Sequence, residues 1–236
     1  MKQTMKLFQM GLKQIANDGM LLVLLPAPIL VGLIFKFAIP FANGILEDNF
    51  SISVLPWYGL VDGMLVCLTP MFVAMASAFL LLEERDEGIC AVYQITPTEG
   101  YSYLAARIGI PMAWAFAISI IVLGVFRISE ISIMTILSSS LISALTGIFS
   151  AMMVVSMAGN RVEGLALSKL MGIGFIGLIL VWFVPEPYSY FSAFLPSFWI
   201  GKLIMDGASV FSFLFGLLTC FIWIFFFARR FLSRIG

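Results

Sequence analysis

Six long apolar stretches constrain most strongly what this chain can fold into. A helix that crosses a bilayer needs about 20 consecutive, mostly apolar residues. Stretches of this kind cover residues 20–41, 57–82, 104–126, 131–157, 165–184 and 209–228. Backbone polar groups must be satisfied inside the hydrocarbon layer, and stretches of this length satisfy them as helices. The sequence therefore predicts an all-α integral membrane protein with six transmembrane helices, formed as a single domain over residues 1–236.

The composition excludes several classes of function. Charged residues make up 11% of the chain and hydrophobic residues 61%, whereas a soluble domain carries about 25% charge. The 13 basic and 13 acidic residues balance, so we expect no nucleic-acid partner. Histidine is absent and the three cysteines are far apart. We therefore expect no metal site and no histidine-dependent catalysis.

The distribution of lysine and arginine predicts the orientation. Ten of these residues fall in segments on one side of the predicted spans: Lys2, Lys6, Lys13, Arg85, Arg107, Arg161, Lys169, Arg229, Arg230 and Arg234. Only Lys36, Arg127 and Lys202 fall on the other side. Basic residues concentrate on the cytoplasmic side of a membrane. We therefore predict a multi-pass protein of the plasma (inner) membrane with both termini in the cytoplasm.

The segment before the first span has a helical pattern of its own, over residues 1–19. Met5, Phe8, Leu12 and Ile15 recur at helical spacing, with lysines beside them. Such a segment can lie along the inner membrane surface as an amphipathic helix. The alternative is a basic tail without fixed structure.

Nucleotide binding by this chain itself is not expected. The phosphate-binding pattern G-x-x-x-x-G-K-[ST] does not occur, and Gly172, Gly174 and Gly177 spell G-x-G-x-x-G inside an apolar span rather than after a strand. That context contradicts a dinucleotide site. It favours close packing, or a flexible helix near a translocation path.

Polar residues within the spans are mostly uncharged. Ser139, Ser143, Thr146 and Ser150 fall on one face of the fourth span. Small polar residues let membrane helices approach closely, so a packing face and a polar strip on a substrate path are both open. No ionisable residue occupies the centre of a span, which disfavours an ion-driven carrier.

The segment between the second and third spans, residues 83–103, carries an unusual charge pattern. Six of the 26 charged residues lie between Glu83 and Glu99. An apolar stretch too short to span follows the acidic cluster and ends before Thr96 and Pro97. We expect this stretch to form a short helix that projects from the inner face of the membrane. The helix should end before Pro97, because proline disfavours a helical conformation of the residue before it. Docking of a soluble partner and a plain loop are both compatible with this pattern.

This segment resembles the first intracellular loop of ABC-2-type exporter permeases. The matching positions are Glu84, Arg85, Glu87, Gly88, Thr96, Pro97, Tyr103 and Leu104, with Arg107 at a basic position. Residues 160–169 and 195–199 resemble two further loops of the small drug-export permeases in this family, whose nearest group is similar to fluoroquinolone exporters.

The resemblance implies a permease subunit of an ATP-driven exporter for an apolar or amphiphilic molecule such as a drug, lipid or modified peptide. The permease would bind no cofactor and would not itself be an enzyme, because two partner ABC ATPase subunits bind ATP and magnesium. A second permease, identical or related, and membrane lipid complete the expected partners. The resemblance also implies an N-terminal elbow helix, a cytoplasmic coupling helix after the second span, and short re-entrant outer helices within residues 185–207.

Two groups of residues follow from this resemblance. The expected ATPase-coupling residues are Glu83, Glu84, Arg85, Glu87, Gly88, Thr96 and Pro97. The expected substrate path, between the second and fifth spans, includes Met71, Met75, Phe79, Ser139, Ser143, Thr146, Phe175 and Leu178, for which packing or lipid contact is the alternative. The main competing function is an ion-gradient-driven carrier or channel that acts without an ATPase. An intramembrane enzyme and a membrane anchor without cargo complete the alternatives.

Overall fold

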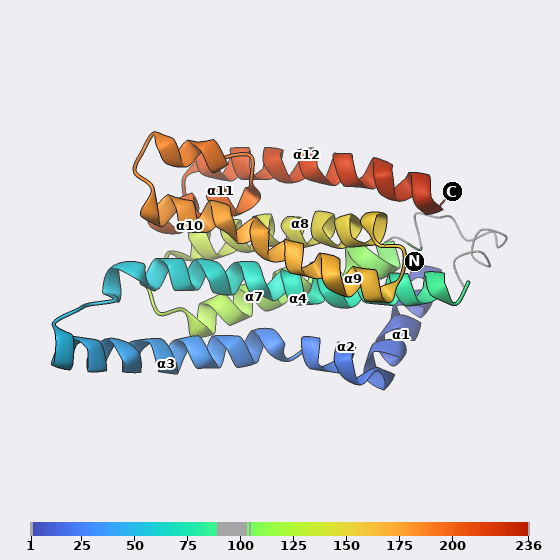
Figure 1. Cartoon of the computed structure of the whole chain (residues 1–236), viewed down its shortest axis with the longest axis horizontal. Coiled ribbons are helices and arrows are strands. Elements are labelled where there is room, and N and C mark those ends of the chain that lie inside the picture. Colours follow the sequence, from blue (N-terminus) through green and yellow to red (C-terminus); the bar gives the residue numbers. More distant parts are fainter. Residues whose placement is uncertain (1, 89–102, 104, 236) are drawn as a thin grey trace.

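The chain folds into a helical bundle (Figure 1). The computed structural model describes residues 2–88, 103 and 105–235, and every regular element in these ranges is helical. Helices α1 (Lys2–Asn17) and α2 (Gly19–Leu24) precede the first span, α3 (Ala27–Phe50). The turn η1 (Leu55–Trp57) leads into α4 (Tyr58–Asp86), and the π-helical turn η2 (Ala105–Gly109) leads into α7 (Ile110–Phe126).

The second half of the chain supplies the remaining spans. Helix α8 (Ile133–Met157) is continuous, whereas the fifth span consists of α9 (Arg161–Ser168), η3 (Lys169–Phe175) and α10 (Ile176–Phe183). A turn η4 (Tyr188–Ser192) and a short helix α11 (Pro196–Met205) precede α12 (Val210–Ile235). Six helices of the described chain are long and apolar enough to cross a membrane. The predicted all-α fold with six spans is thus confirmed.

Both termini lie at the same end of the bundle, which we call the terminal end; the other end is the distal end (Figure 1). The spans run side by side along the long axis of the molecule. Helix α4 lies among them and packs against α7, α8, α9, α11 and α3. The end of α4 and the starts of α7 and α9 therefore meet at the terminal end.

The first and fifth spans differ from their predicted forms. The first span begins at Ala27, because Pro26 and Pro28 cannot donate backbone hydrogen bonds and so separate α2 from α3. It continues to Phe50, where Ser51 adopts a left-handed conformation with a φ of 55°. The fifth span is interrupted where Gly172 and Gly174 lower the helix propensity.

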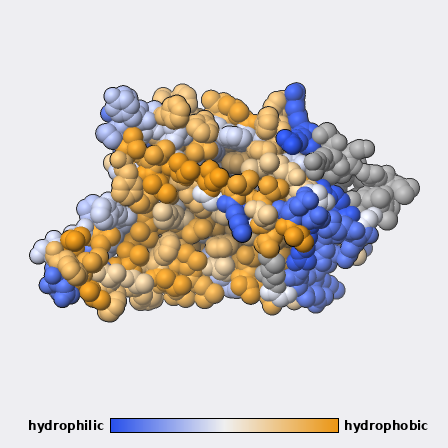
Figure 2. Space-filling view, in the orientation of Figure 1, coloured by the Kyte–Doolittle hydropathy of each residue, from blue (hydrophilic) through white to orange (hydrophobic). Residues whose placement is uncertain are grey.

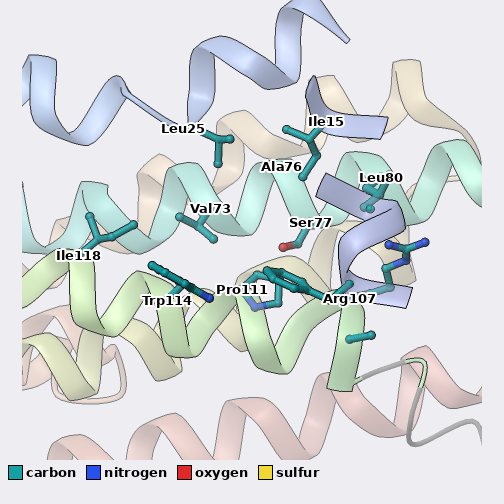
Figure 3. Close-up of a pocket in the computed structure, with 13 residues that line it drawn as sticks. Ile15, Leu25, Val73, Ala76, Ser77, Leu80, Arg107, Pro111, Trp114 and Ile118 are labelled. Carbon is teal, nitrogen blue, oxygen red and sulfur yellow. The ribbon is translucent and has the colours of Figure 1, made fainter. Parts of the chain in front are cut away.

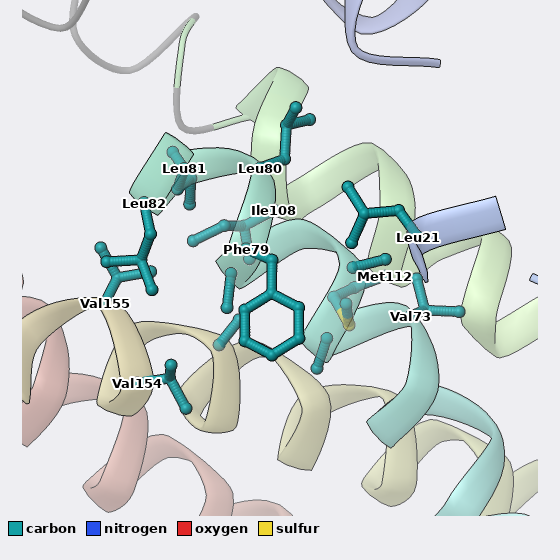
Figure 4. Packing of buried hydrophobic residues seen from close by; sticks show 14 of the residues in the cluster. Leu21, Val73, Phe79, Leu80, Leu81, Leu82, Ile108, Met112, Val154 and Val155 are labelled. Atoms are coloured by element: carbon teal, nitrogen blue, oxygen red, sulfur yellow. The ribbon is translucent and has the colours of Figure 1, made fainter. Parts of the chain in front are cut away.

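One apolar core fills the terminal half of the bundle (Figure 4). Phe79 and Leu82 of α4 lie among Val154 of α8 and Ile108 near the start of α7. Gly164 lets α9 approach this core, since a Cβ atom there would overlap the Leu82 side chain. A second core in the distal half joins α4, α7, α8, α11 and α12.

The surface separates apolar from charged residues. Apolar residues cover the middle of the molecule, and hydrophilic residues gather toward its ends (Figure 2). Large apolar side chains are exposed along α3 and α12, among them Phe37, Phe41, Phe221 and Phe225. A soluble monomer rarely exposes such extended apolar surface. The surface is therefore that of a multi-pass membrane protein.

Candidate functional site

A buried ion pair lies where α4 reaches the terminal end. The Arg107 guanidinium of η2 contacts the Glu84 carboxylate of α4, and the side chains are only 2% and 1% exposed. The Tyr103 hydroxyl donates a further hydrogen bond to Glu84 over 2.7 Å. A buried carboxylate requires partners of this kind. Glu84 therefore joins α4 to the segment that enters α7.

The neighbouring residue Arg85 binds the end of α8. Its guanidinium donates to the carbonyl oxygens of Val155 (3.3 Å) and Ala158 (2.7 Å). The last carbonyls of a helix lack intrahelical partners, and a cation near them is favourable. Arg85 thus caps α8 from the end of α4.

A third set of contacts holds the start of α9. The Arg161 backbone N–H donates to Asp86 over 3.0 Å, and its guanidinium pairs with Asp18 and lies 3.4 Å from Glu83. Asp18 also accepts a hydrogen bond from the Leu21 N–H and so caps α2. The end of α4 is consequently connected to α2, α8, α9 and η2.

The expected coupling residues fall into two groups in the structure. Glu83, Glu84 and Arg85 take part in the contacts between helices. Glu87 and Gly88 lie on the surface, and Gly88 has a φ of 72°, which favours glycine. Thr96, Pro97 and the expected coupling helix lie outside the described residues. Glu87 and Gly88 are therefore the outward-facing part of this group.

A cavity of about 330 Å³ lies between α4, α8, the fifth span, α11 and α12. Its walls are mainly apolar and aromatic, with hydroxyl groups from Ser143, Thr146, Ser150 and Ser197. Its described lining residues include no charged side chain. Such walls suit an apolar or amphiphilic molecule better than an inorganic ion.

Half of the expected path residues line this cavity. Met71, Ser143, Thr146 and Phe175 belong to its wall. Phe79 and Leu178 are fully buried in packing contacts, Leu178 against Gly63 and Gly201. Met75 packs against the core of the terminal half, and Ser139 is buried within α8.

The polar strip of α8 combines packing with cavity contact. Ser139 donates back to the Thr135 carbonyl of its own helix over 2.6 Å. Ser143 donates to the Val66 carbonyl of α4 over 2.7 Å and so links two spans. Ser139 is therefore buried and bonded within its own helix, whereas Ser143 both links α8 to α4 and lines the cavity.

The glycines of the fifth span also serve packing. A Cβ atom at Gly177 would lie 2.8 Å from the Phe198 backbone nitrogen, so this glycine permits the close approach of α11. Gly174 lines the cavity, and its carbonyl accepts a hydrogen bond from Ser197. The close packing that the sequence favours is present at Gly177.

Sequence reasoning missed several residues of these sites. Asn160 and Glu163 cap the start of α9. The Glu163 N–H donates to the Asn160 side chain over 2.9 Å, and the Glu163 carboxylate accepts from the Gly159 N–H over 2.6 Å. The spacing of Asn and Glu is a recognisable signal. Asp18 is separated from Arg161 by 143 positions in sequence. The aromatic residues Phe149, Trp223 and Phe227 of the cavity wall carry no local signal that separates them from lipid-facing residues.

At the distal end, Asp62 has a structural position. Its buried carboxylate accepts hydrogen bonds from the backbone N–H groups of Ile128 (3.0 Å) and Ser129 (2.9 Å) and from the Ser129 hydroxyl. These contacts hold the turn between α7 and α8 on α4. Asp62 is thus bound to the backbone and lies outside the cavity.

Six apolar spans, an apolar cavity between four of them and a charged network at one end are the features of a membrane permease. The family model described as fluoroquinolones export permease protein Rv2686c-like matches residues 11–228. The chain belongs to this family.

Two curated relatives agree with this assignment. The chain is 23% identical over 191 residues to the fluoroquinolones export permease protein Rv2686c of Mycobacterium tuberculosis H37Rv. It has the same identity to protein MT2760 of strain CDC 1551, and in both cases the match covers 79% of this chain and 75% of the relative. No solved structure matches the chain.

Proposed function

We propose that this chain is the membrane subunit of an ATP-driven exporter, powered by separate ATPase subunits. The observation that carries the proposal is the set of contacts around the end of α4. Glu84, Arg85 and Asp86 connect this end to η2, α8 and α9. A force applied to the segment that follows α4 would therefore reach several spans together.

The proposed docking surface comprises Glu87, Gly88 and the segment 89–103. Glu87 and Gly88 lie at the terminal end, which we place in the cytoplasm because most lysines and arginines fall on that side. Glu87 is exposed and follows the helix directly. It is therefore the described residue best placed to contact an ATPase without supporting the fold.

The proposed cargo is a planar aromatic amphiphile of the fluoroquinolone class, for which the relatives are named. Phe149 lies 5.9 Å from Trp223 between ring centroids, and Trp223 lies 5.8 Å from Phe227. These rings line the cavity together with hydroxyl groups. Aromatic faces can stack on a flat ring system, and hydroxyl groups can bind its polar substituents.

Co-purification with charge-reversed variants tests the proposal. The tagged chain is isolated from its native membrane in mild detergent, and accompanying proteins are identified. We expect a soluble subunit with a phosphate-binding loop that is lost with Glu87→Arg. Glu130→Arg is the matched control, since Glu130 is exposed at the distal end, and it should retain the subunit.

Transport assays separate this function from an ion-gradient-driven carrier. Vesicles that contain the complex should move a fluoroquinolone only with ATP. Vesicles prepared with Glu87→Arg, supplied with the ATPase subunit and ATP, should not transport it. Transport by the purified chain alone under an ion gradient would contradict the proposal. The mass of the complex shows whether two permease chains and two ATPase subunits assemble, as we propose.

A further inference from the structure

A second cavity, of about 260 Å³, lies beneath α1 at the terminal end (Figure 3). It is lined by α1, Leu25 between α2 and α3, α4, η2 and the start of α7. Its described lining residues are Phe8, Gly11, Ile15, Leu25, Val73, Ala76, Ser77, Leu80, Ala106, Arg107, Pro111, Trp114 and Ile118. It shares no lining residue with the proposed cargo cavity.

The walls of this cavity favour an apolar occupant over water. Ser77 and Arg107 are the polar side chains among its described lining residues, and the Arg107 guanidinium binds Glu84. Water in a protein cavity needs two to four polar partners, about three on average, and the walls provide few. An empty space would forfeit dispersion contacts along its whole lining. A hydrocarbon chain needs no polar partners and supplies dispersion contacts along the lining.

The cavity opens toward the apolar surface that faces lipid. Leu25 and Trp114 belong to its wall and are 39% and 60% exposed. Arg107, at the other end of the lining, lies near the charged residues of the terminal end. The cavity therefore extends from the level of the charged network into the apolar band, as an acyl chain does within one leaflet.

Helix α1 supplies a charged surface above the cavity. Gly11 and Ile15 line the cavity, whereas Lys6 and Lys13 are exposed and project from the other side of the helix. An amphipathic helix in this position buries its apolar face and leaves its lysines at the level of lipid headgroups. Anionic phosphates are attracted to such lysines.

We propose that this cavity is a binding site for one acyl chain of an anionic phospholipid from the leaflet on the terminal side. The acyl chain enters between Leu25 and Trp114. It lies against Val73, Ala76 and Ser77 of α4. The headgroup lies beside α1 and its lysines. The bound lipid fills the space between α1 and the bundle and so fixes the position of α1.

Photochemical labelling tests this site directly. The full chain is reconstituted in vesicles that contain phosphatidylglycerol with a diazirine in the middle of one acyl chain. After irradiation, lipid adducts are mapped by peptide mass spectrometry. We expect adducts on Val73, Ala76 and Ser77, because these residues are buried and bulk lipid reaches them only through the cavity. Adducts confined to exposed positions such as Leu25 and Trp114 would overturn the proposal.

A cavity-filling variant and two competitors sharpen the test. Ser77→Phe should lose the adducts on Val73 and Ala76, whereas the matched Ser150→Phe, which fills the other cavity, should keep them. Circular dichroism and the elution volume in gel filtration check that both variants fold. The map of lipid adducts on the wild-type chain tests the site even if a variant does not fold. Displacement of the lipid by a fluoroquinolone would overturn the proposal and assign the cavity to cargo. Equal labelling by phosphatidylcholine would overturn the assignment of the anionic headgroup.

Discussion

Arg107 and Glu84 form a buried ion pair that joins the start of the third span to the end of the second. Both side chains are almost inaccessible, and Tyr103 binds the same carboxylate. The backbone of Gly11 lies so close to the Arg107 guanidinium that a Cβ atom there would overlap it. The ion pair thus joins α4 to η2, and α1 approaches closely at its guanidinium.

Removal of either partner of this pair should destabilise the protein strongly. Loss of one charge from a buried pair costs about 3–5 kcal/mol, so Glu84→Leu and Arg107→Met should each lower the thermal unfolding midpoint in detergent. The double variant should lose less stability than the two single variants lose together, because no unpaired charge is then left buried. Strictly additive losses would contradict the coupling of the two residues.

Two glycines of the fifth span should respond oppositely to alanine. Gly177→Ala places a Cβ atom 2.8 Å from the Phe198 backbone nitrogen, and overpacking of this kind costs about 1–3 kcal/mol. Gly172 has open space around it, and Gly172→Ala should leave stability unchanged or raise it by up to about 1 kcal/mol. Thermal unfolding in one detergent compares the pair, and equal effects would contradict the close approach of α11 at Gly177.

Replacement of Asp62 should loosen the turn between α7 and α8. Asp62→Asn removes the charge that accepts two backbone hydrogen bonds, and hydrogen bonds to charged groups contribute about 1.5–3 kcal/mol each. We expect a lower unfolding midpoint and faster amide exchange at Ile128 and Ser129. Asp48→Asn, at an exposed position of α3, is the control. Unchanged exchange at both amides would mean that Asp62 does not hold the turn.

Filling the proposed cargo cavity should block transport of the proposed cargo. Ser150 lines this cavity, and Ser150→Phe should abolish ATP-dependent uptake into inverted vesicles while the complex still assembles. Ser138→Phe introduces the same ring on α8 outside the described cavity wall and should transport normally. Normal uptake by Ser150→Phe would place the path elsewhere.

The sequence predicted part of the candidate site. The acidic end of the second span was consistent with partner docking or a plain loop, and the pattern could not separate Glu84, which is buried, from Glu87, which is exposed. The two residues are three positions apart, yet the partners that bury Glu84 come from residues 103 and 107. Likewise, equal helical spacing in α8 did not distinguish Ser139, which bonds to its own helix, from Ser143, which binds α4.

The sequence by itself determined that the chain forms six apolar helices, because hydropathy and length are properties of each segment alone. It indicated neither the break at the prolines before the first span nor the extension of that span to Phe50. Tertiary structure decided which polar residues meet and where the two cavities lie. These features depend on contacts between residues up to 143 positions apart, which the packing of the helices brings together and no local pattern encodes.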